Sequence, residues 1–238
     1  MDLFKYAQGQ TFPVGTLYLV ATPIGNLADI TIRALHILMQ VDGIACEDKR
    51  HSSSLLNAYG ISKPLYAIHE HNEKSASQYI IEKLAQGERW AYISDAGTPG
   101  ISDPAFLLVR ECIRVGVAVE CLPGATAFVP ALINSGLPSN RFAFEGFLPV
   151  KKGRQSLLKK LATEERTLLF YESPHRLVKT LEEFIVYFGK TRPCGVSREL
   201  TKLHEENFRG TLEEALLHYG QKEVKGELVI VVGGVEME

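Results

Sequence analysis

The sequence predicts an α/β protein with two domains, and three observations carry this prediction. Apolar runs rich in β-branched residues alternate with helical patterns, which is typical of a largely parallel sheet flanked by helices. After the Pro123–Gly124 pair, strands and helices continue in a different arrangement. The length of 238 residues suits one large domain or two compact ones. We therefore expect a loose leader at residues 1–14 and α/β domains at residues 15–123 and 124–238.

Each expected element of the first domain has a local signal, either a short apolar run or a helical spacing of apolar residues. Asp29 lies near the start of the first helix, Asp103 and Pro104 would begin the last one, and Gly116 would close it. The helices are expected at residues 31–40, 52–59, 74–86 and 103–116. The strands are expected at residues 16–21, 43–47, 64–68, 90–94 and 118–122.

The second domain shows the same two kinds of signal. Its basic, glycine-containing segment at residues 149–153 reads as an exposed loop. The strands are expected at residues 142–148, 167–171, 194–198 and 227–232. The helices are expected at residues 125–134, 156–162, 177–188 and 211–219.

The formal net charge of −2 argues against a protein that binds nucleic acid through a general basic excess. An RNA contact would need a local basic patch. Two segments offer one, and they contain Lys49 with Arg50, and Lys151 and Lys152 with Arg154. Either segment is read equally well as a solvated helix face or loop.

The four cysteines lack paired spacing, so the sequence predicts neither a zinc site nor a redox motif, and no metal is expected. This cysteine usage fits reduced thiols in the cytoplasm. The amino terminus lacks the basic and apolar segments of a signal peptide, and no apolar run is long enough to span a bilayer. We therefore expect a cytoplasmic protein with no membrane contact.

Glycine- and proline-containing segments follow three of the expected strands, at residues 22–26, 95–103 and 123–126. Because ligands bind beyond the carboxyl ends of strands in open α/β sheets, these loops predict one pocket. None of them contains the Gly-Lys-Ser/Thr of a P-loop or the GxGxxG of a dinucleotide fold. Asp95 could accept hydrogen bonds from a ligand amine or hydroxyl. The same segments are also compatible with ordinary turns.

The segment DAGTPGISDP at residues 95–104 resembles the signature of the ribosomal RNA small subunit methyltransferase I family, a branch of the tetrapyrrole methylase superfamily. The resemblance covers nearly all of residues 15–233. Several separate motifs in the same order make it highly specific. They are LVATPIGNLADITIRAL (19–35), ACEDKRHS (45–52), LPGATAFVPAL (122–132), FLPVKKGRQ (147–155), FYESPHR (170–176), SRELTKLHEE (197–206) and GELVIVV (226–232).

The resemblance implies a two-domain tetrapyrrole methylase-like fold, with the methyl donor S-adenosyl-L-methionine in the cleft between the domains, and commonly a homodimer. It implies methylation of the ribose 2′-hydroxyl of a cytidine in the decoding region of 16S ribosomal RNA, with the small ribosomal subunit as partner. By motif match, the donor site would include Pro23, Asp95, Gly97, Thr98, Thr126, Ala127, Tyr171, Ser197 and Glu227.

Charged residues that follow two strands are the candidates for work on the acceptor. Arg198, Glu199 and Lys202 are the catalytic candidates, and Glu47 and Asp48 are further charged groups near a strand end. A lysine acts as a base only if burial lowers its pKa. We favour the alternative in which Arg198 and Lys202 hold RNA phosphates while Glu199 pairs with them.

Two features depart from the family pattern. Ala105 stands where the family usually has glycine, and alanine is well tolerated at the start of a helix. Some members carry a helical extension after the last strand, and we expect this chain, which stops at Glu238, to hold RNA without one. Two other functions stay open. One is methylation of a tetrapyrrole precursor, and the other is a non-catalytic ribosome-assembly module that binds RNA but no donor.

Overall fold

The computed structural model describes residues 5, 11–69, 72–102, 105–221 and 223–235. The chain divides into two compact units, Met1–Thr126 and Ala127–Glu238, and each is described by itself. The division lies just beyond the Pro123–Gly124 pair. The expected helix start at Asp103 and Pro104 lies outside the described residues. Among the described residues, no helix has the length and apolar character needed to cross a membrane.

The first unit is built on a five-stranded sheet with the order β3-β2-β4-β1-β5, in which every neighbouring pair is parallel. The three central strands β2, β4 and β1 are buried along their whole length. A parallel sheet of this kind needs cover on both faces. The strands are β1 (Thr16–Val20), β2 (Gly43–Cys46), β3 (Leu65–Ala67), β4 (Trp90–Ile93) and β5 (Ala118–Cys121).

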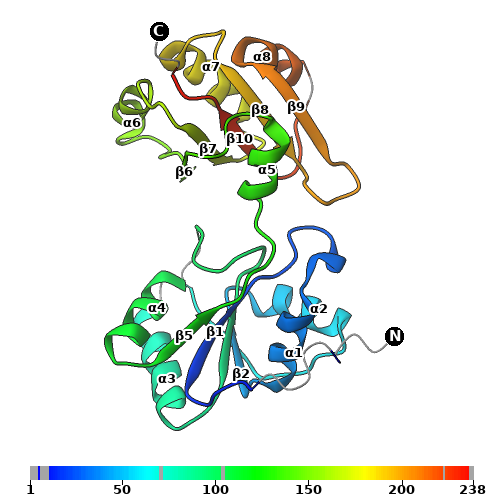
Figure 1. The fold of residues 1–238 in the computed structure, drawn as a ribbon, viewed down its shortest axis with the longest axis vertical. Coiled ribbons are helices and arrows are strands. Elements are labelled where there is room, and N and C mark those ends of the chain that lie inside the picture. Colours follow the sequence, from blue (N-terminus) through cyan, green and yellow to red (C-terminus); the bar gives the residue numbers. More distant parts are fainter. Residues whose placement is uncertain (1–4, 6–10, 70–71, 103–104, 222, 236–238) are drawn as a thin grey trace. The chain divides into compact units, whose positions relative to one another are not determined.

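Alternate residues of β1 point into two different cores of the first unit. Tyr18 and Val20 join a cluster that contains residues of α1 and α2, whereas Leu17 and Leu19 join one that contains residues of α3 and α4. Figure 1 accordingly shows α1 and α2 on one side of the sheet and α3 and α4 on the other. The helices are the 3-10 turn η2 (Leu27–Asp29), α1 (Ile32–Gln40), α2 (Lys49–Ala58), α3 (Glu73–Ala85) and α4 (Ala105–Arg114).

The start of α2 differs from the sequence-based expectation. The helix begins at Lys49 rather than at Ser52, because Asp48 is its N-cap. The Asp48 carboxylate accepts the backbone N–H of Arg50 at 2.7 Å, which satisfies a free donor of the first turn. Lys49 and Arg50 therefore lie on the first turn of a helix and not in a loop.

Two further expectations for the first unit are corrected. Thr31 caps α1, since its hydroxyl accepts the N–H of Ala34, whereas Asp29 ends η2. Phe12 was assigned to the loose leader, yet it is buried in the core cluster that contains α1. Its ring meets that of Tyr18 edge-on, with the ring centroids 6.1 Å apart.

The second unit has a mixed five-stranded sheet with the order β6-β7-β10-β8-β9. β6 pairs with β7 in parallel, and the other three pairs are antiparallel. One core cluster joins the sheet to α6, α7 and α8. The helices are α5 (Phe128–Ser135), α6 (Arg154–Leu161), α7 (Leu177–Phe188) and α8 (Leu212–Gly220). The strands are β6 (Phe142–Phe147), β7 (Thr167–Glu172), β8 (Pro193–Arg198), β9 (Glu206–Thr211) and β10 (Leu228–Val232).

β9 was not expected from the sequence, and two helices begin at other residues than expected. β9 reads ENFRGT, which has little apolar alternation, and it lies at the edge of the sheet with β8 as its one neighbour. Edge strands tolerate polar residues because one side faces solvent. α5 begins at Phe128 rather than at residue 125, and α6 begins at Arg154 rather than at residue 156.

Candidate functional site

The loops at the carboxyl ends of the strands meet at one edge of the first unit, because all five strands are parallel. The loop after β1 and the loop after β4 are joined by an isolated bridge between Thr22 and Gly97. Each residue donates its N–H to the carbonyl of the other at 3.0 Å. Inside this bridge, the buried Ser94 hydroxyl donates to the Gly97 carbonyl at 2.8 Å. Two of the loops predicted to line the pocket are thus joined by hydrogen bonds.

Gly97 has a conformation that only glycine adopts without strain. Its φ is +83°, and a Cβ at this position would lie 3.2 Å from Ile24 Cγ2 and 3.4 Å from the Ala125 carbonyl oxygen. The neighbouring Thr98 hydroxyl donates to the same Ala125 carbonyl at 3.0 Å. The loop after β5 is therefore fixed to the loop after β4, and Thr126 follows directly. Glycine at residue 97 therefore lets the loops after β1, β4 and β5 pack together.

A second pair of contacts joins the loops that follow β2 and β4. The backbone N–H of Asp95 donates to the Glu47 carboxylate at 3.3 Å, and the N–H of Asp48 donates to the Asp95 carboxylate at 3.4 Å. All three of these acidic residues are partly exposed at this edge. Their charge disfavours a phosphate here and favours a ligand that offers cationic or hydroxyl groups.

These contacts place four of the expected donor-site residues together. Pro23, Asp95, Gly97 and Thr98 all lie within the joined loops, and Thr126 ends the first unit. Thr22, Ser94 and Glu47 hold these loops in place. None of them is a donor-site residue by motif match, although Thr22 lies in a loop predicted to line the pocket and Glu47 was a charged candidate near a strand end. Their signal was their position next to the glycine-containing segments. Within the described residues, no group of three His, Cys, Asp or Glu side chains could hold a metal ion.

The second unit also gathers its family-like motifs at one edge of its sheet. β7 and β8 are both antiparallel to β10, and β6 is parallel to β7, so β6, β7 and β8 all end at this edge. The loops that follow them contain KKGR, ESPHR and ELTKLHE. β10 begins at the same edge, directly after Gly226 and Glu227.

Glu199, Lys202 and Glu227 form a closed cluster at this edge. Lys202 Nζ lies 2.8 Å from Glu199 Oε1 and 2.8 Å from Glu227 Oε2. The Glu227 N–H donates to Glu199 Oε1 at 3.0 Å. Gly226 makes room for this cluster, since a Cβ there would overlap the Glu199 carboxylate. Lys202 is thus paired with two carboxylates and is not free to bind a phosphate as had been expected from the sequence.

The electrostatics of this cluster also argue against proton transfer by Glu199 or Lys202. Burial disfavours the charged form of Glu199, but the contacts with Lys202 and the Glu227 N–H outweigh this effect and lower the pKa of Glu199. Burial likewise acts to lower the pKa of Lys202, and its bonds to the two carboxylates raise it above the ordinary value. A lysine base needs a lowered pKa, so this arrangement stabilises the ion pair instead.

Arg198 is similarly engaged. Its Nε donates to Glu206 at 2.9 Å, and its Nη1 donates to the Lys225 carbonyl at 3.2 Å. Glu206 in turn contacts His218 Nε2 at 2.6 Å. Arg198 therefore ties β8 to β9 and to the segment before β10, and its guanidinium is only partly available to a ligand.

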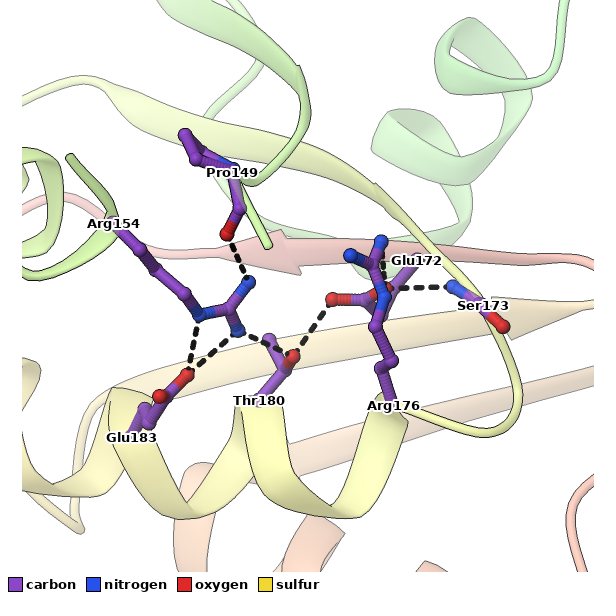
Figure 2. A network of polar contacts seen from close by, with 7 residues as sticks. All are labelled: Pro149, Arg154, Glu172, Ser173, Arg176, Thr180 and Glu183. Carbon is purple, nitrogen blue, oxygen red and sulfur yellow. Dashed lines mark hydrogen bonds and ion pairs between the residues drawn. The ribbon is translucent and has the colours of Figure 1, made fainter. Parts of the chain in front are cut away.

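Arg154 was expected to contact RNA, and the structure corrects this assignment. The residue is 7% exposed, and Figure 2 shows its guanidinium enclosed by Pro149, Thr180 and Glu183. By contrast, Lys151 and Lys152 are exposed in the loop before it. Lys49 and Arg50 are also exposed, although Arg50 lies 3.3 Å from Asp48.

The remaining donor-site candidates lie in the second unit. Tyr171, on β7, packs against the rings of Phe144 and Phe147, at centroid distances of 5.0 and 5.6 Å. Ser197 is buried on β8, and its hydroxyl donates to Asn207 at 2.6 Å. Ala127 directly precedes α5. The Ser197 hydroxyl thus has a partner within the fold, whereas the Glu227 side chain is 75% exposed.

The chain matches a family model, two related sequences and a solved structure, all of them methylases or methyltransferases. Residues 16–216 match the model of the tetrapyrrole (corrin/porphyrin) methylases. The chain is 52% identical to ribosomal RNA small subunit methyltransferase I of Haemophilus influenzae, over 92% of this chain and 79% of that protein. It is 49% identical to the Synechocystis protein of the same name, over 94% of this chain and 81% of that protein. Its fold matches uroporphyrin-III C-methyltransferase of Thermus thermophilus complexed with S-adenosylhomocysteine (20% identity, TM-score 0.63, 92% of this chain and 97% of the other).

Proposed function

Because the chain belongs to the tetrapyrrole methylase family and, within it, to the ribosomal RNA small subunit methyltransferase I family, we propose that it methylates 16S ribosomal RNA with S-adenosyl-L-methionine. The acceptor is the ribose 2′-hydroxyl of a cytidine in the decoding region. The observation that carries the donor half of this proposal is the Thr22–Gly97 bridge, which joins loops of the matching motifs at the carboxyl edge of the first sheet.

The residues of the first unit fit this donor. Gly97 lets the surrounding loops pack closely, because a Cβ there would crowd Ile24 and the Ala125 carbonyl. The Asp95 carboxylate can accept hydrogen bonds from the hydroxyl or amine groups of the donor. The acidic groups at this edge tolerate a ligand that has a positive sulfonium and no phosphate. Pro23, Thr98 and Thr126 complete this side of the site. Ala127, Tyr171, Ser197 and Glu227 are proposed as donor-site residues by motif match.

When bound, S-adenosylmethionine would supply an electrophilic methyl group, so that a bond from the acceptor oxygen to the methyl carbon would form as the methyl C–S bond broke, with S-adenosylhomocysteine and the hydroxyl proton released. The task of the protein is then to hold the two reactants in line, which supplies up to about 7–11 kcal/mol of the barrier reduction. The fixed loops around Gly97 serve this task, because they do not have to be ordered when the donor binds. Lys202 and Glu199 are not proposed as bases, since the raised pKa of Lys202 keeps it protonated and the lowered pKa of Glu199 makes its carboxylate a weaker base.

Contacts to the RNA are proposed for the exposed basic residues. Lys151 and Lys152 follow β6, and Lys49 and Arg50 lie on the first turn of α2. Phosphate contacts orient an RNA without reading its sequence, which suits these exposed lysine and arginine side chains. We place the reaction in the cytoplasm and propose a homodimer, as the resemblance to the family implies.

One experiment tests the whole proposal and its alternatives. The protein is incubated with S-adenosylmethionine labelled in the methyl group and with small ribosomal subunits that lack the modification, and the label is then mapped. Label on a cytidine ribose is the expected result. Donor binding without labelled RNA would point to a tetrapyrrole precursor or another acceptor. Absence of donor binding would point to the non-catalytic assembly module.

A further inference from the structure

A buried network of polar side chains lies beneath the basic loop of the second unit (Figure 2). The Arg154 guanidinium donates to Glu183 through Nε at 2.7 Å and contacts it through Nη2 at 2.6 Å. Nη2 also donates to the Thr180 hydroxyl at 2.8 Å, and Nη1 donates to the Pro149 carbonyl at 3.2 Å. All three nitrogens of the guanidinium are engaged within the fold, so Arg154 cannot itself reach a phosphate.

The network continues through Thr180 to a second arginine. The Thr180 hydroxyl accepts from Arg154 and donates to Glu172 at 2.7 Å. The other Glu172 oxygen lies 2.7 Å from Arg176 and accepts the N–H of Ser173. Two arginines and two glutamates balance in charge, which is the condition under which a buried polar network is stable. The network therefore joins the FLPVKKGRQ segment to the FYESPHR segment.

The consequence for the loop at residues 149–153 is that both of its ends are fixed. Arg154 Nη1 donates to the carbonyl of the first residue, Pro149, and the Arg154 backbone N–H donates to the Lys151 carbonyl at 3.3 Å. Gly153, with a φ of +85°, makes the turn into α6. Lys151 and Lys152 are left exposed, and neither forms an ion pair with a residue in the described part of the chain.

We propose that Arg154, Thr180 and Glu183 form a latch that positions Lys151 and Lys152 to contact the phosphate backbone of the acceptor RNA. Arg154 is thus a positioning residue and not an RNA ligand. A loop that is already ordered does not lose conformational freedom when it binds, so the latch raises affinity without touching the RNA. This inference rests on the proposed RNA substrate and goes beyond it, because it assigns how one part of the RNA-binding surface is built.

The test compares two variants of α7 that make the same change of charge. Glu183→Ala removes the partner of Arg154, and Glu182→Ala removes the exposed neighbouring carboxylate. If only net charge mattered, both would bind unmodified small ribosomal subunits more tightly. The latch predicts about tenfold weaker binding for Glu183→Ala and unchanged or slightly tighter binding for Glu182→Ala. Equal affinities of the two variants would overturn the latch.

A second pair of variants, at Thr180, tests the latch with smaller changes in case Glu183→Ala does not fold. Thr180→Ser keeps the bridging hydroxyl and is expected to bind subunits like the unmodified protein. Thr180→Val has a similar shape but no hydroxyl, and it is expected to bind more weakly.

Gly153→Ala leaves the latch and every charge in place, and a Cβ there meets no atom within 4 Å. Because it strains the turn, it is expected to weaken binding as well.

Non-additivity provides the last criterion. In a Lys151→Ala/Lys152→Ala background, Thr180→Val should cause no further loss of subunit binding, because the latch acts only through these lysines. An additive loss would show that the network acts by another route and would overturn the proposal. S-adenosylmethionine binding, measured by calorimetry, should be equal in all variants. If the wild-type protein did not bind subunits, the proposal that RNA is the substrate would be wrong. That result differs from a failure of the latch, in which the wild-type protein binds subunits and the variants bind equally well.

Discussion

Thr22 and Gly97 each donate a backbone N–H to the carbonyl of the other at 3.0 Å, and the two residues form an isolated bridge beyond the ends of the strands. Because β1 and β4 are already neighbours in the sheet, the bridge prolongs their association into the loops. The buried Thr22 hydroxyl also donates to the Ser94 carbonyl at 3.1 Å. The proposed donor-binding loop is thus held by backbone and hydroxyl contacts, and it needs no side chain at residue 97.

Gly97→Ala is expected to weaken S-adenosylmethionine binding at least tenfold. The substitution combines backbone strain at φ +83°, about 1–3 kcal/mol, with crowding of Ile24 and the Ala125 carbonyl. Gly100→Ala is the matched control, because its φ is +86° but a Cβ there meets nothing within 4 Å. Thermal unfolding should show a loss of stability for both variants, larger for Gly97→Ala because of the added crowding, and calorimetric titration should show a loss of donor affinity for Gly97→Ala alone. Equal donor affinities would exclude a role for the close packing at Gly97.

Asp95→Ala is expected to abolish donor binding without unfolding the protein. Asp95 is only partly buried, and among the described residues its carboxylate accepts one long hydrogen bond, from the Asp48 N–H, so its loss removes little from the fold. Asp95→Asn keeps one acceptor oxygen and should retain part of the affinity. Calorimetry with S-adenosylmethionine checks both, and circular dichroism checks the fold. Unchanged affinity of Asp95→Ala would remove this residue from the site.

The sequence predicted the loops of the first unit well because glycine and proline segments follow apolar strands there. Parallel pairing then brings those segments to one edge. The contacts between the loops could not be predicted, since Thr22 and Ser94 are separated by 72 residues and look like ordinary strand-end residues. The start of α2 was misplaced because the capping role of Asp48 was overlooked, although Asp48 stands directly before Lys49.

Lys202→Ala is expected to leave the salt dependence of RNA binding unchanged. Lys202 is already paired with Glu199 and Glu227, and a lysine neutralised in this way releases no counterions from RNA. Lys151→Ala/Lys152→Ala should lower the slope of log affinity against log salt concentration by about 0.7 for each RNA phosphate that the variant no longer neutralises. Filter binding of unmodified small subunits at several salt concentrations checks both. A flatter slope for Lys202→Ala would restore it as a phosphate ligand.

The same cluster should make the stability of the protein depend on pH in acid. The pKa of Glu199 is lower in the folded protein than in the unfolded chain, so its stabilising effect is complete above the unfolded pKa and is lost as pH falls through the folded one. Glu199→Gln should therefore reduce stability near neutral pH and lose less of it on acidification. Urea unfolding at neutral pH and again in acid, below the ordinary pKa of a glutamate, checks this. Parallel losses in both proteins would show that the Glu199 charge does not stabilise the fold.

Arg154 shows why sequence reasoning was less successful in the second unit. A Lys-Lys-Gly-Arg segment reads as one basic patch, and only burial separates its members into two exposed lysines and one enclosed arginine. The partners of Arg154 are Thr180 and Glu183, 26 and 29 residues away, and they lie on α7. Their spacing of three residues places them on one face of that helix. That pattern becomes informative only when α6 is known to pack beside α7.

Glu47 offers a test of whether the acidic edge of the first unit acts by charge or by hydrogen bonding. Its carboxylate accepts the Asp95 N–H at 3.3 Å and so helps to set the direction of the Asp95 side chain. Glu47→Gln keeps an acceptor oxygen and is expected to bind S-adenosylmethionine within about twofold of the unmodified protein. Glu47→Ala leaves the Asp95 N–H without this acceptor and is expected to bind about tenfold more weakly, in line with the loss of roughly one hydrogen bond. Calorimetry measures both affinities. If Glu47→Gln lost as much affinity as Glu47→Ala, the negative charge itself would be acting on the donor, and Glu47 would be a ligand of the sulfonium or amine and not a support for Asp95.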